Sequence, residues 1–245
     1  MSLWGKVWEW QNKRHPFCSA IIPAAGTSQR MGGENKLFMH LAGMPVLMHT
    51  LCAIDRTELV DEMIVAVQEE LLLEVADLCS RCELHKPVRV IRGGSTRTES
   101  VLAAALEADP KAELLAVHDG ARPLVRPEDF DEMIRLGGKT YAVAPALPVS
   151  DTIKVADASG LVQSTPERAS LYAVQTPQVF QANLLRAALQ SALTCGAELT
   201  DDCSAVERLG KEVYLAPGNQ ENIKITTPLD LIVAEGILRY REAHG

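Results

Sequence analysis

Short runs of consecutive apolar residues recur along the first half of the chain, separated by stretches in which apolar residues follow helical spacing. These runs predict buried strands, and the helical spacing predicts the helices between them. The expected strands are 20–22, 63–67, 88–91, 114–117 and 141–144, and the expected helices are 46–53, 71–78, 101–108, 130–136, 184–193, 202–209 and 229–240. Fully apolar strands that alternate with helices are typical of a parallel sheet with both faces covered. We therefore expect a Rossmann-like α/β fold with a mostly parallel sheet.

Residues 148–180 break this alternation. They are rich in β-branched and turn-forming residues, and the Asp-Ala-Ser-Gly sequence at 157–160 predicts a tight turn between two short strands. A hairpin that projects from an α/β body cannot bury both of its faces alone. We therefore expect an arm at about 148–172 that packs against a second subunit, so that the protein is a homodimer.

The length of 245 residues fits one α/β domain, which we place at 17–245, after an N-terminal extension at 1–16. The extension holds all three tryptophans, Trp4, Trp8 and Trp10. Helical spacing would put Trp4 and Trp8 on one face. We favour an extra helix packed on the body over an anchor for a partner or a membrane surface.

The composition excludes some classes of function. A net charge of −8 argues against a general affinity for nucleic acid. The sequence contains neither an apolar run long enough to cross a bilayer nor a recognisable signal peptide. Six scattered cysteines predict reduced thiols in a cytoplasmic protein. Cys79 and Cys82 form a C-x-x-C pair, but no second pair follows at metal-ligand spacing, so two helical cysteines are the simpler interpretation.

A loop rich in small residues follows the first expected strand, with the sequence PAAGTSQRMGGENK at 23–36. Small residues let backbone N–H groups approach a phosphate chain closely, and Arg30 and Lys36 supply positive charge. The loop is neither a Walker motif nor a dinucleotide fingerprint, because the required glycine spacings are missing. It predicts a nucleoside triphosphate site, with an ordinary glycine-rich turn as the alternative.

Six motifs along the chain occur in the order found in one family. They are 23–36, 93–101 (GGSTRTESV), 117–123 (VHDGARP), 175–178 (QTPQ), 199–202 (LTDD) and 222–226 (NIKIT). Together they resemble the 2-C-methyl-D-erythritol 4-phosphate cytidylyltransferases, a family of the sugar nucleotidyltransferase superfamily, from about residue 18 to residue 240. The resemblance implies an enzyme of the non-mevalonate isoprenoid pathway that joins CMP from CTP to methylerythritol phosphate and releases pyrophosphate. It also implies Mg²⁺ as cofactor.

Both reactants of such a transfer are polyanions, so catalysis should consist of alignment and neutralisation of charge. A general base is not needed, because a phosphate monoester near neutral pH is already mostly anionic. Arg30 and Lys36 suit the triphosphate, and Lys224 suits the same phosphorus from the side of the attacking phosphate. The resemblance implies these three catalytic roles.

Asp119 follows the fourth expected strand, where a carboxylate could hold Mg²⁺ or a substrate hydroxyl. A structural ion pair with Arg122 is the alternative. The family often has a second acid where Glu221 stands, so we predict Asp119 and Glu221 as metal ligands, although glutamate is one methylene longer than aspartate. His118 should face away from the site, because neighbouring strand residues point to opposite sides.

The resemblance also implies two sets of binding residues. The nucleotide set is Ala24, Ala25, Gly26, Gly94, Arg97, Ser100 and Asp119. The set for the polyol phosphate is Thr152, Arg168 and Thr200. Thr152 and Arg168 lie on the expected arm, so in this family they reach the active site of the neighbouring subunit. Backbone groups of Ala24, Ala25 and Gly94 could read the pyrimidine, whereas Ser100 also fits an ordinary position in a first helical turn.

The chain departs from the family pattern at four positions, Ser28, Asn35, Leu37 and Gly120, where glycine, proline, glutamine and alanine are usual. The charged residues are spared. Ribitol 5-phosphate cytidylyltransferase, which uses another polyol phosphate, remains the nearest alternative. A nucleotide-binding regulatory module without turnover is the alternative from another class. An NAD-dependent oxidoreductase is disfavoured because its glycine spacing is missing.

Overall fold

The computed structural model describes residues 15–26 and 35–244. In this part of the chain an eight-stranded sheet forms the centre of the fold, with the order β10-β7-β11-β6-β1-β4-β5, and β12 also pairs with β7. Its strands are β1 (Cys18–Pro23), β4 (Glu62–Val67), β5 (Val88–Arg92), β6 (Leu114–Val117), β7 (Ala142–Pro148), β10 (Tyr172–Val174), β11 (Gln178–Gln181) and β12 (Tyr214–Pro217). The mostly parallel α/β sheet that the sequence predicts is confirmed.

Two short strands run against the others. β11 pairs antiparallel with both β6 and β7, and β10 continues along β7 in the same antiparallel direction. β12 is parallel to β7. The sequence did not predict β10, β11 or β12 as members of the sheet. Tyr141, which was expected in a strand, instead caps a helix with φ of 68°, and β7 begins one residue later.

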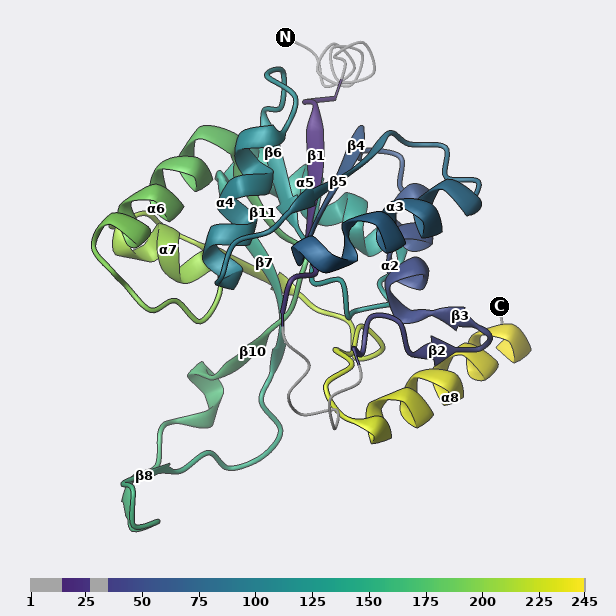
Figure 1. Cartoon of the computed structure of the whole chain (residues 1–245). Coiled ribbons are helices and arrows are strands. Elements are labelled where there is room, and N and C mark those ends of the chain that lie inside the picture. Colours follow the sequence, from purple (N-terminus) through teal and green to yellow (C-terminus); the bar gives the residue numbers. More distant parts are fainter. Residues whose placement is uncertain (1–14, 27–34, 245) are drawn as a thin grey trace, which may run out of the picture.

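Helices cover both faces of the sheet, as expected (Figure 1). They are α2 (Val46–Asp55), α3 (Leu72–Arg81), α4 (Arg97–Glu107), α5 (Pro127–Thr140), α6 (Ala182–Thr194) and α7 (Asp202–Arg208). A further helix, α8 (Pro228–His244), contacts β2. One core packs under α4, α6 and α7, and the other packs under α2, α3 and α5. In β1, Ile21 belongs to the first core, whereas Ala20 and Ile22 belong to the second. This alternation explains why the strand is apolar throughout.

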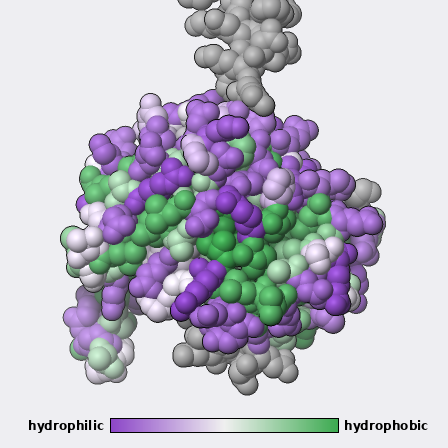
Figure 2. All heavy atoms as spheres, turned by 45° about the horizontal axis from the view of Figure 1, so that its top comes forward, coloured by the Kyte–Doolittle hydropathy of each residue, from purple (hydrophilic) through white to green (hydrophobic). Residues whose placement is uncertain are grey.

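The predicted arm projects from the body at the bottom of Figure 1, between β7 and β10. Its two short strands, β8 (Val155–Ala156) and β9 (Val162–Ser164), pair with each other, and the predicted turn lies between them. The Asp157 carboxylate accepts hydrogen bonds from the N–H groups of Ser159 and Leu161, and Gly160 has a positive φ of 88°. Figure 2 shows the arm standing away from the body at the lower left. Its role in dimerisation stays a prediction.

The predicted N-terminal extension falls almost entirely on residues 1–14, which lie outside the described residues. A second small pair of strands, β2 (His40–Leu41) and β3 (Met44–Pro45), precedes α2. All six cysteines are free, and Cys79 and Cys82 lie at the end of α3. Among the residues described, no helix has the length and apolar character needed to cross a membrane.

Two adjacent glycines of α5 give a matched test of this packing. A Cβ atom on Gly137 would lie 2.6 Å from Cγ1 of Val179, a fully buried residue of β11, whereas one on Gly138 would meet nothing nearer than 3.9 Å. Gly137→Ala should therefore lower the free energy of unfolding by about 1–3 kcal/mol through overpacking. Gly138→Ala should raise it by about 0.5–1 kcal/mol, because alanine favours helix over glycine. Urea denaturation of both variants measures this, and equal effects would contradict the described packing.

Candidate active site

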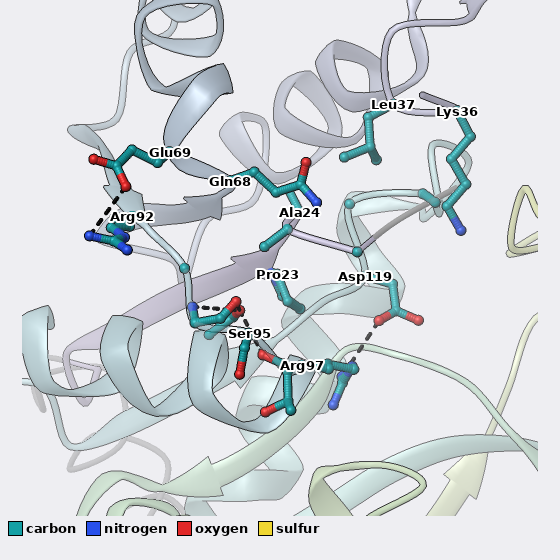
Figure 3. Close-up of a pocket in the computed structure, with 18 of the residues that line it drawn as sticks. Pro23, Ala24, Lys36, Leu37, Gln68, Glu69, Arg92, Ser95, Arg97 and Asp119 are labelled. Carbon is teal, nitrogen blue, oxygen red and sulfur yellow. Dashed lines mark hydrogen bonds and ion pairs between the residues drawn. The ribbon is translucent and has the colours of Figure 1, made fainter. Parts of the chain in front are cut away.

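The carboxyl ends of β1, β4, β5 and β6 open into a cavity of about 740 Å³ (Figure 3). In open α/β sheets this edge is where ligands bind. The cavity brings together all of the described residues that the sequence predicted for the nucleotide and the catalytic cations. These are Ala24, Ala25, Gly26, Lys36, Gly94, Arg97, Ser100, Asp119 and Lys224. Arg30 lies outside the described residues.

The loop after β1 enters the cavity directly from the sheet. The N–H of Ala24 donates to the carbonyl of Ala66 at 2.7 Å, so the β1–β4 pairing continues to the cavity wall. On the far side of residues 27–34, the side-chain oxygen of Asn35 accepts from the N–H of Leu37 at 3.2 Å. This contact is an Asx-type turn, which is one way for asparagine to stand where proline is usual. Lys36 lies within this turn and lines the cavity.

Two of the departures from the family pattern lie next to each other in space. Leu37 is buried, and a Cβ atom on Gly120 would lie 3.5 Å from its Cδ2 atom. The same Cβ would lie 3.2 Å from Cδ1 of Leu47 and 3.3 Å from Cγ2 of Ile22, so the space is already tight. Because Leu37 packs here, glycine at position 120 avoids the crowding that the usual alanine would cause next to the cavity.

The loop after β5 is shaped by its glycines and by Ser100. A Cβ atom on Gly93 would lie 2.8 Å from both Cβ of Ala25 and Oγ of Ser100, and one on Gly94 would overlap Glu99. Ser100 Oγ accepts from the N–H of Gly94 at 3.0 Å and donates to the carbonyl of Thr96 at 2.8 Å. Ser100 therefore holds the loop in shape, and the N–H of Gly94, like that of Ala24, is engaged within the protein.

Asp119 lies at the end of β6 among three cations. Its carboxylate is 2.8 Å from Nζ of Lys224, 3.5 Å from Nη2 of Arg97 and 3.7 Å from Nε of Arg122. Burial acts to raise the pKa of Asp119, but Arg97, Lys224 and Arg122 outweigh it and hold the pKa well below its usual range. The carboxylate is therefore ionised, and the predicted ion pair with Arg122 exists alongside its position in the cavity.

Arg97 lies between two carboxylates. Its Nη2 atom is 2.7 Å from Oδ2 of Asp202, which is buried at the start of α7, in addition to its contact with Asp119. Burial lowers the pKa of the guanidinium, but Asp202 and Asp119 more than offset this and raise it above its usual value. The sequence marked Arg97 as a nucleotide residue, but it did not identify Asp202 as its partner.

The motif at 175–178 connects three parts of the site. Gln178 accepts from the N–H groups of Asp202 and Cys203, both at 3.1 Å, at the first turn of α7. Thr176 Oγ1 accepts from the N–H of Asp119 at 3.1 Å, and Gln175 donates to the carbonyl of Asn219 at 2.9 Å. These residues do not line the cavity, so only their contacts reveal that they organise it.

His118 faces away from the cavity, as predicted. Its ring is fully buried, 5.5 Å from that of Phe130, and bonds the Thr176 hydroxyl at 3.1 Å and the Arg122 carbonyl at 3.2 Å. Burial lowers the pKa of His118 to about 4.

The structure does not bring Glu221 to the cavity. Its carboxylate accepts hydrogen bonds from Arg126 and Arg241, both at 2.8 Å, on the side of α8. Two guanidinium groups already satisfy it, and this geometry gives no support to its predicted role as a metal ligand. Among the described residues there is no group of three or more His, Cys, Asp or Glu side chains that could hold a metal ion without help.

The residues predicted for the polyol phosphate also lie outside the cavity of their own chain. Thr152 and Arg168 are exposed on the arm, where Arg168 Nη1 donates to the carbonyl of Ser150 at 3.0 Å. Thr200 is exposed before α7. A single chain thus contains the predicted nucleotide half of the site, and these three residues stand apart from it.

A doubly covered α/β sheet with a glycine-shaped loop and converging cations at its carboxyl edge is the architecture of a nucleotide-binding transferase. A family model described as 2-C-methyl-D-erythritol 4-phosphate cytidylyltransferase matches residues 18–240. The chain therefore belongs to the 2-C-methyl-D-erythritol 4-phosphate cytidylyltransferase family.

Individual relatives agree with this assignment. The chain is 43% identical over 223 residues to the enzyme of that name from Caldanaerobacter subterraneus subsp. tengcongensis, covering 90% of this chain and 98% of the relative. It is also 43% identical to the enzyme of the same name from Thermosynechococcus vestitus, covering 90% of this chain and 95% of the relative. Among solved structures, the 4-diphosphocytidyl-2C-methyl-D-erythritol synthase of Anaerococcus prevotii matches with a TM-score of 0.82 at 32% identity, covering 92% of this chain and 97% of that one.

The ionised Asp119 should stabilise the fold as well as shape the site. Asp119→Asn removes the carboxylate that Arg97, Arg122 and Lys224 share, and leaves Asp202 beside Arg97 alone, so it should lower the free energy of unfolding at pH 7 by about 3 kcal/mol. Because the folded-state pKa lies below the usual 3.8, this stabilisation is complete above about pH 5 and is lost as the pH falls through the folded value. Urea denaturation from pH 7 to pH 3 should show a difference in the free energy of unfolding between wild type and Asp119→Asn that is constant down to about pH 5 and shrinks below it.

The matched control is Asp77→Asn, which breaks an exposed ion pair with Arg81 on α3. It should cost no more than about 0.5 kcal/mol. An Asp119→Asn variant no less stable than this control would show that the cations do not depend on the carboxylate.

Proposed function

We propose that this protein transfers CMP from CTP to 2-C-methyl-D-erythritol 4-phosphate, releasing pyrophosphate, as a step in the non-mevalonate synthesis of isoprenoid precursors. The family match over residues 18–240 supports the reaction. The single structural observation that carries it is the cluster of Lys224, Arg97 and Arg122 around Asp119, which opens into a cavity lined by the two small-residue loops.

In the proposed reaction, an oxygen of the substrate phosphate attacks the α-phosphorus of CTP. A new P–O bond forms as the bond from the α-phosphorus to the bridging β-phosphate oxygen breaks, and pyrophosphate leaves with that electron pair. The attacking phosphate is already mostly anionic near neutral pH, so its oxygen needs no base. The barrier lies in bringing two polyanions together, which cations aligned in advance can lower.

Lys36 and Lys224 line the cavity from different segments of the chain, as a clamp on a transferring phosphorus requires. The Lys224 ammonium is anchored by Asp119 at 2.8 Å, and 38% of the side chain remains exposed toward a ligand. We assign Lys36, together with Arg30 from the loop that lies outside the described residues, to the triphosphate. Lys224 then neutralises charge between the α-phosphorus and the attacking phosphate.

The loops at 24–26 and 93–94 lie against each other in the wall of the cavity and suit the cytidine. Their side chains are small enough for a flat base to lie against the backbone. Because the N–H groups of Ala24 and Gly94 are engaged within the protein, we assign base reading to carbonyl groups of these loops and to Ala25. Ser100 acts by holding Gly94 in place.

The donor set fits Mg²⁺ that arrives with the triphosphate. Magnesium in phosphate-transfer sites is bound by one or two carboxylates together with phosphate oxygens, and Asp119 is an ionised carboxylate that lines this cavity beside Lys224. Asp119 would hold the ion, which would neutralise charge on the phosphate oxygens. Glu221 is not part of this proposal, because Arg126 and Arg241 hold it elsewhere.

We further propose that the protein is a homodimer in which the arm completes the neighbouring active site. The arm leaves the sheet at the carboxyl end of β7, on the same edge as the cavity, and exposes apolar side chains that a monomer would leave in water (Figure 2). Those at least 39% exposed are Ile153, Val155, Leu161 and Val162 on the arm, and Tyr172 and Val174 on the adjoining strand β10. The free cysteines fit a reducing compartment, and we propose a cytoplasmic location.

Pyrophosphate release tests the reaction. The protein, Mg²⁺, each of the four nucleoside triphosphates and either methylerythritol phosphate or ribitol 5-phosphate are combined in turn. We expect release only with CTP and methylerythritol phosphate. Turnover with ribitol phosphate alone would move the protein to that neighbouring activity. No turnover with any pair would leave a nucleotide-binding regulatory module as the better reading.

Arg168 tests the contribution of the arm. Removing a guanidinium that binds the substrate phosphate should raise KM for methylerythritol phosphate in Arg168→Ala by about tenfold to a hundredfold, with KM for CTP changed less than about threefold. Lys154→Ala is the matched control, since Lys154 is an exposed arm cation bonded to Thr165. An unchanged KM for methylerythritol phosphate would remove Arg168 from the site.

Mixing subunits asks whether the arm acts in trans. Arg168→Ala and Lys224→Ala chains are each impaired, but a mixed dimer with arms exchanged contains one site with both defects and one with neither. Unfolding and refolding an equal mixture should therefore restore about a quarter of wild-type activity. Activity no higher than the average of the two variants would place Arg168 and Lys224 in the same chain's site.

A further inference from the structure

The C-x-x-C pair of the sequence, Cys79 and Cys82, has a third thiol as a neighbour in the structure. Cys52 of α2 and Cys82, which follows α3, line the same surface cavity of about 440 Å³. All three cysteines are partly buried, and Cys79 and Cys82 pack against the core under α2, α3 and α5. None of the three lines the active-site cavity. The fold thus gathers three thiols at a place that the proposed reaction does not use.

Asp55 ties the two sides of this thiol cavity together. It is the last residue of α2, one helical turn beyond Cys52, and its carboxylate reaches the segment that follows Cys82. There it accepts hydrogen bonds from the N–H groups of His85 and Lys86 and from Nδ1 of His85, all at 2.9 Å. Burial acts to raise the pKa of Asp55, but these hydrogen bonds outweigh it and lower the pKa. The ionised carboxylate therefore holds the two cysteine-bearing segments next to each other.

The electrostatic effects of the thiols on one another agree with this arrangement. Burial raises the pKa of Cys52, and a negative charge on Cys82 raises it further, by more than Asp55 does from the same helix. Burial and charges on Cys82 and Cys52 raise the pKa of Cys79 to about 11. Cys82 is therefore within electrostatic reach of both other thiols. Cys52 and Cys79 keep their protons near neutral pH, as expected of a reduced cluster.

We propose that Cys52 and Cys82 form a site of reversible oxidation, at which a low-molecular-weight disulfide such as oxidised glutathione links α2 to the end of α3. The two residues come from separate elements, line the same cavity and are both partly exposed. Cys79 does not line this cavity, so Cys52 is the expected partner of Cys82. Disulfides of this kind in a reducing compartment are usually transient and sense the redox state.

Two thiol–disulfide exchange steps form the link. In the first, the Cys82 thiolate attacks one sulfur of oxidised glutathione, whose S–S bond breaks and releases one glutathione thiolate. The Cys82 sulfur then carries no charge, so it no longer raises the pKa of Cys52. In the second step Cys52 passes its proton to water, and its thiolate attacks the Cys82 sulfur and releases the second glutathione thiolate. Two protein thiols are oxidised to one disulfide, one oxidised glutathione is reduced, and excess reduced glutathione reverses both steps.

The link would close a loop of residues 52–82 around β4, which lies between β1 and β5 in the sheet. A cross-link that closes a loop stabilises a fold mainly by restricting the unfolded chain. The oxidised protein should therefore resist unfolding more strongly than the reduced protein. This effect concerns the stability of the fold, so it does not depend on the proposed reaction.

Disulfide mapping in glutathione buffers gives the first measurement. The whole chain is equilibrated at several ratios of oxidised to reduced glutathione, free thiols are trapped with acid and N-ethylmaleimide, and peptides are analysed by mass spectrometry without reduction. We expect a peptide pair joined through Cys52 and Cys82. The exposed Cys195 should carry glutathione, which shows that the oxidant has reacted. The link should disappear when reduced glutathione is restored.

Three single variants identify the partners of the link. Cys79→Ser is the matched control, because it removes a thiol of the same cluster and should leave the link in place. Cys52→Ser and Cys82→Ser should each abolish the link and leave the remaining thiol as a mixed disulfide with glutathione. A wild-type link through Cys79 would overturn the proposal, and so would glutathione on both Cys52 and Cys82 with no link between them.

Urea denaturation gives the second measurement. Oxidised wild type should unfold at a midpoint about 1 M higher in urea than reduced wild type, because residues 52–82 then form a closed loop. The same oxidation of Cys52→Ser should not raise the midpoint. A wild-type midpoint that stays constant or falls on oxidation would mean that the link distorts the fold, which contradicts the proposed site. Neither measurement uses turnover, so failure of this site and failure of the proposed reaction are detected separately.

Discussion

The site depends on one carboxylate, Asp119, that keeps three cations together. Arg97 comes from the start of α4, Arg122 from the turn after β6, and Lys224 from the segment before α8. Without the carboxylate these groups would repel one another at short range in a partly buried place. The carboxylate lets them converge, and it neutralises only part of their charge. An acidic chain with a net charge of −8 thereby gains a local site for a polyanion.

The sheet brings these groups to one place because its parallel strands end together. The register pairs Pro23 at the end of β1 with Ala66 of β4, and Val67 of β4 with Arg92 of β5. The chain therefore enters each loop at nearly the same level. Packing below the loops is adjusted to match, and the contact between Leu37 and the space above Gly120 is one example. Leu37 and Gly120 both differ from the residues that are usual in the family, and their contact explains the two differences together.

The sequence predicts the parts of this protein that are decided locally. Apolar runs identified β1, β4 and β6, which are buried, and also β5, which is half-buried at the edge of the sheet, and turn-forming residues identified the arm. β11 was missed because it is four residues long and flanked by polar side chains, and its place between β6 and β7 is fixed by tertiary pairing. β12 was missed because most of its residues are exposed, so its sequence lacks a buried pattern.

The same limit applies to the site. Its position after a strand was enough to mark Asp119 as a candidate, and the family resemblance identified Lys36 and Lys224. Residue type alone does not say which partner a side chain chooses. Glu221 is a residue type that often binds metal, yet two arginines pair with it away from the cavity. Asp202 is a residue type that is common in the first turn of a helix, yet it forms an ion pair with Arg97.

The reversed direction of β11 explains how residues 175–177 come to organise the site. In a fully parallel sheet, the segment before a strand lies at the edge opposite the ligand. An antiparallel strand places its amino end among the carboxyl ends of its neighbours, so the approach to β11 runs along the ligand edge. Thr176 can then bond to the backbone after β6 and to Asn222 at once. Reversing one strand gives this sheet an additional supporting segment at its ligand edge, built from side chains that never enter the cavity.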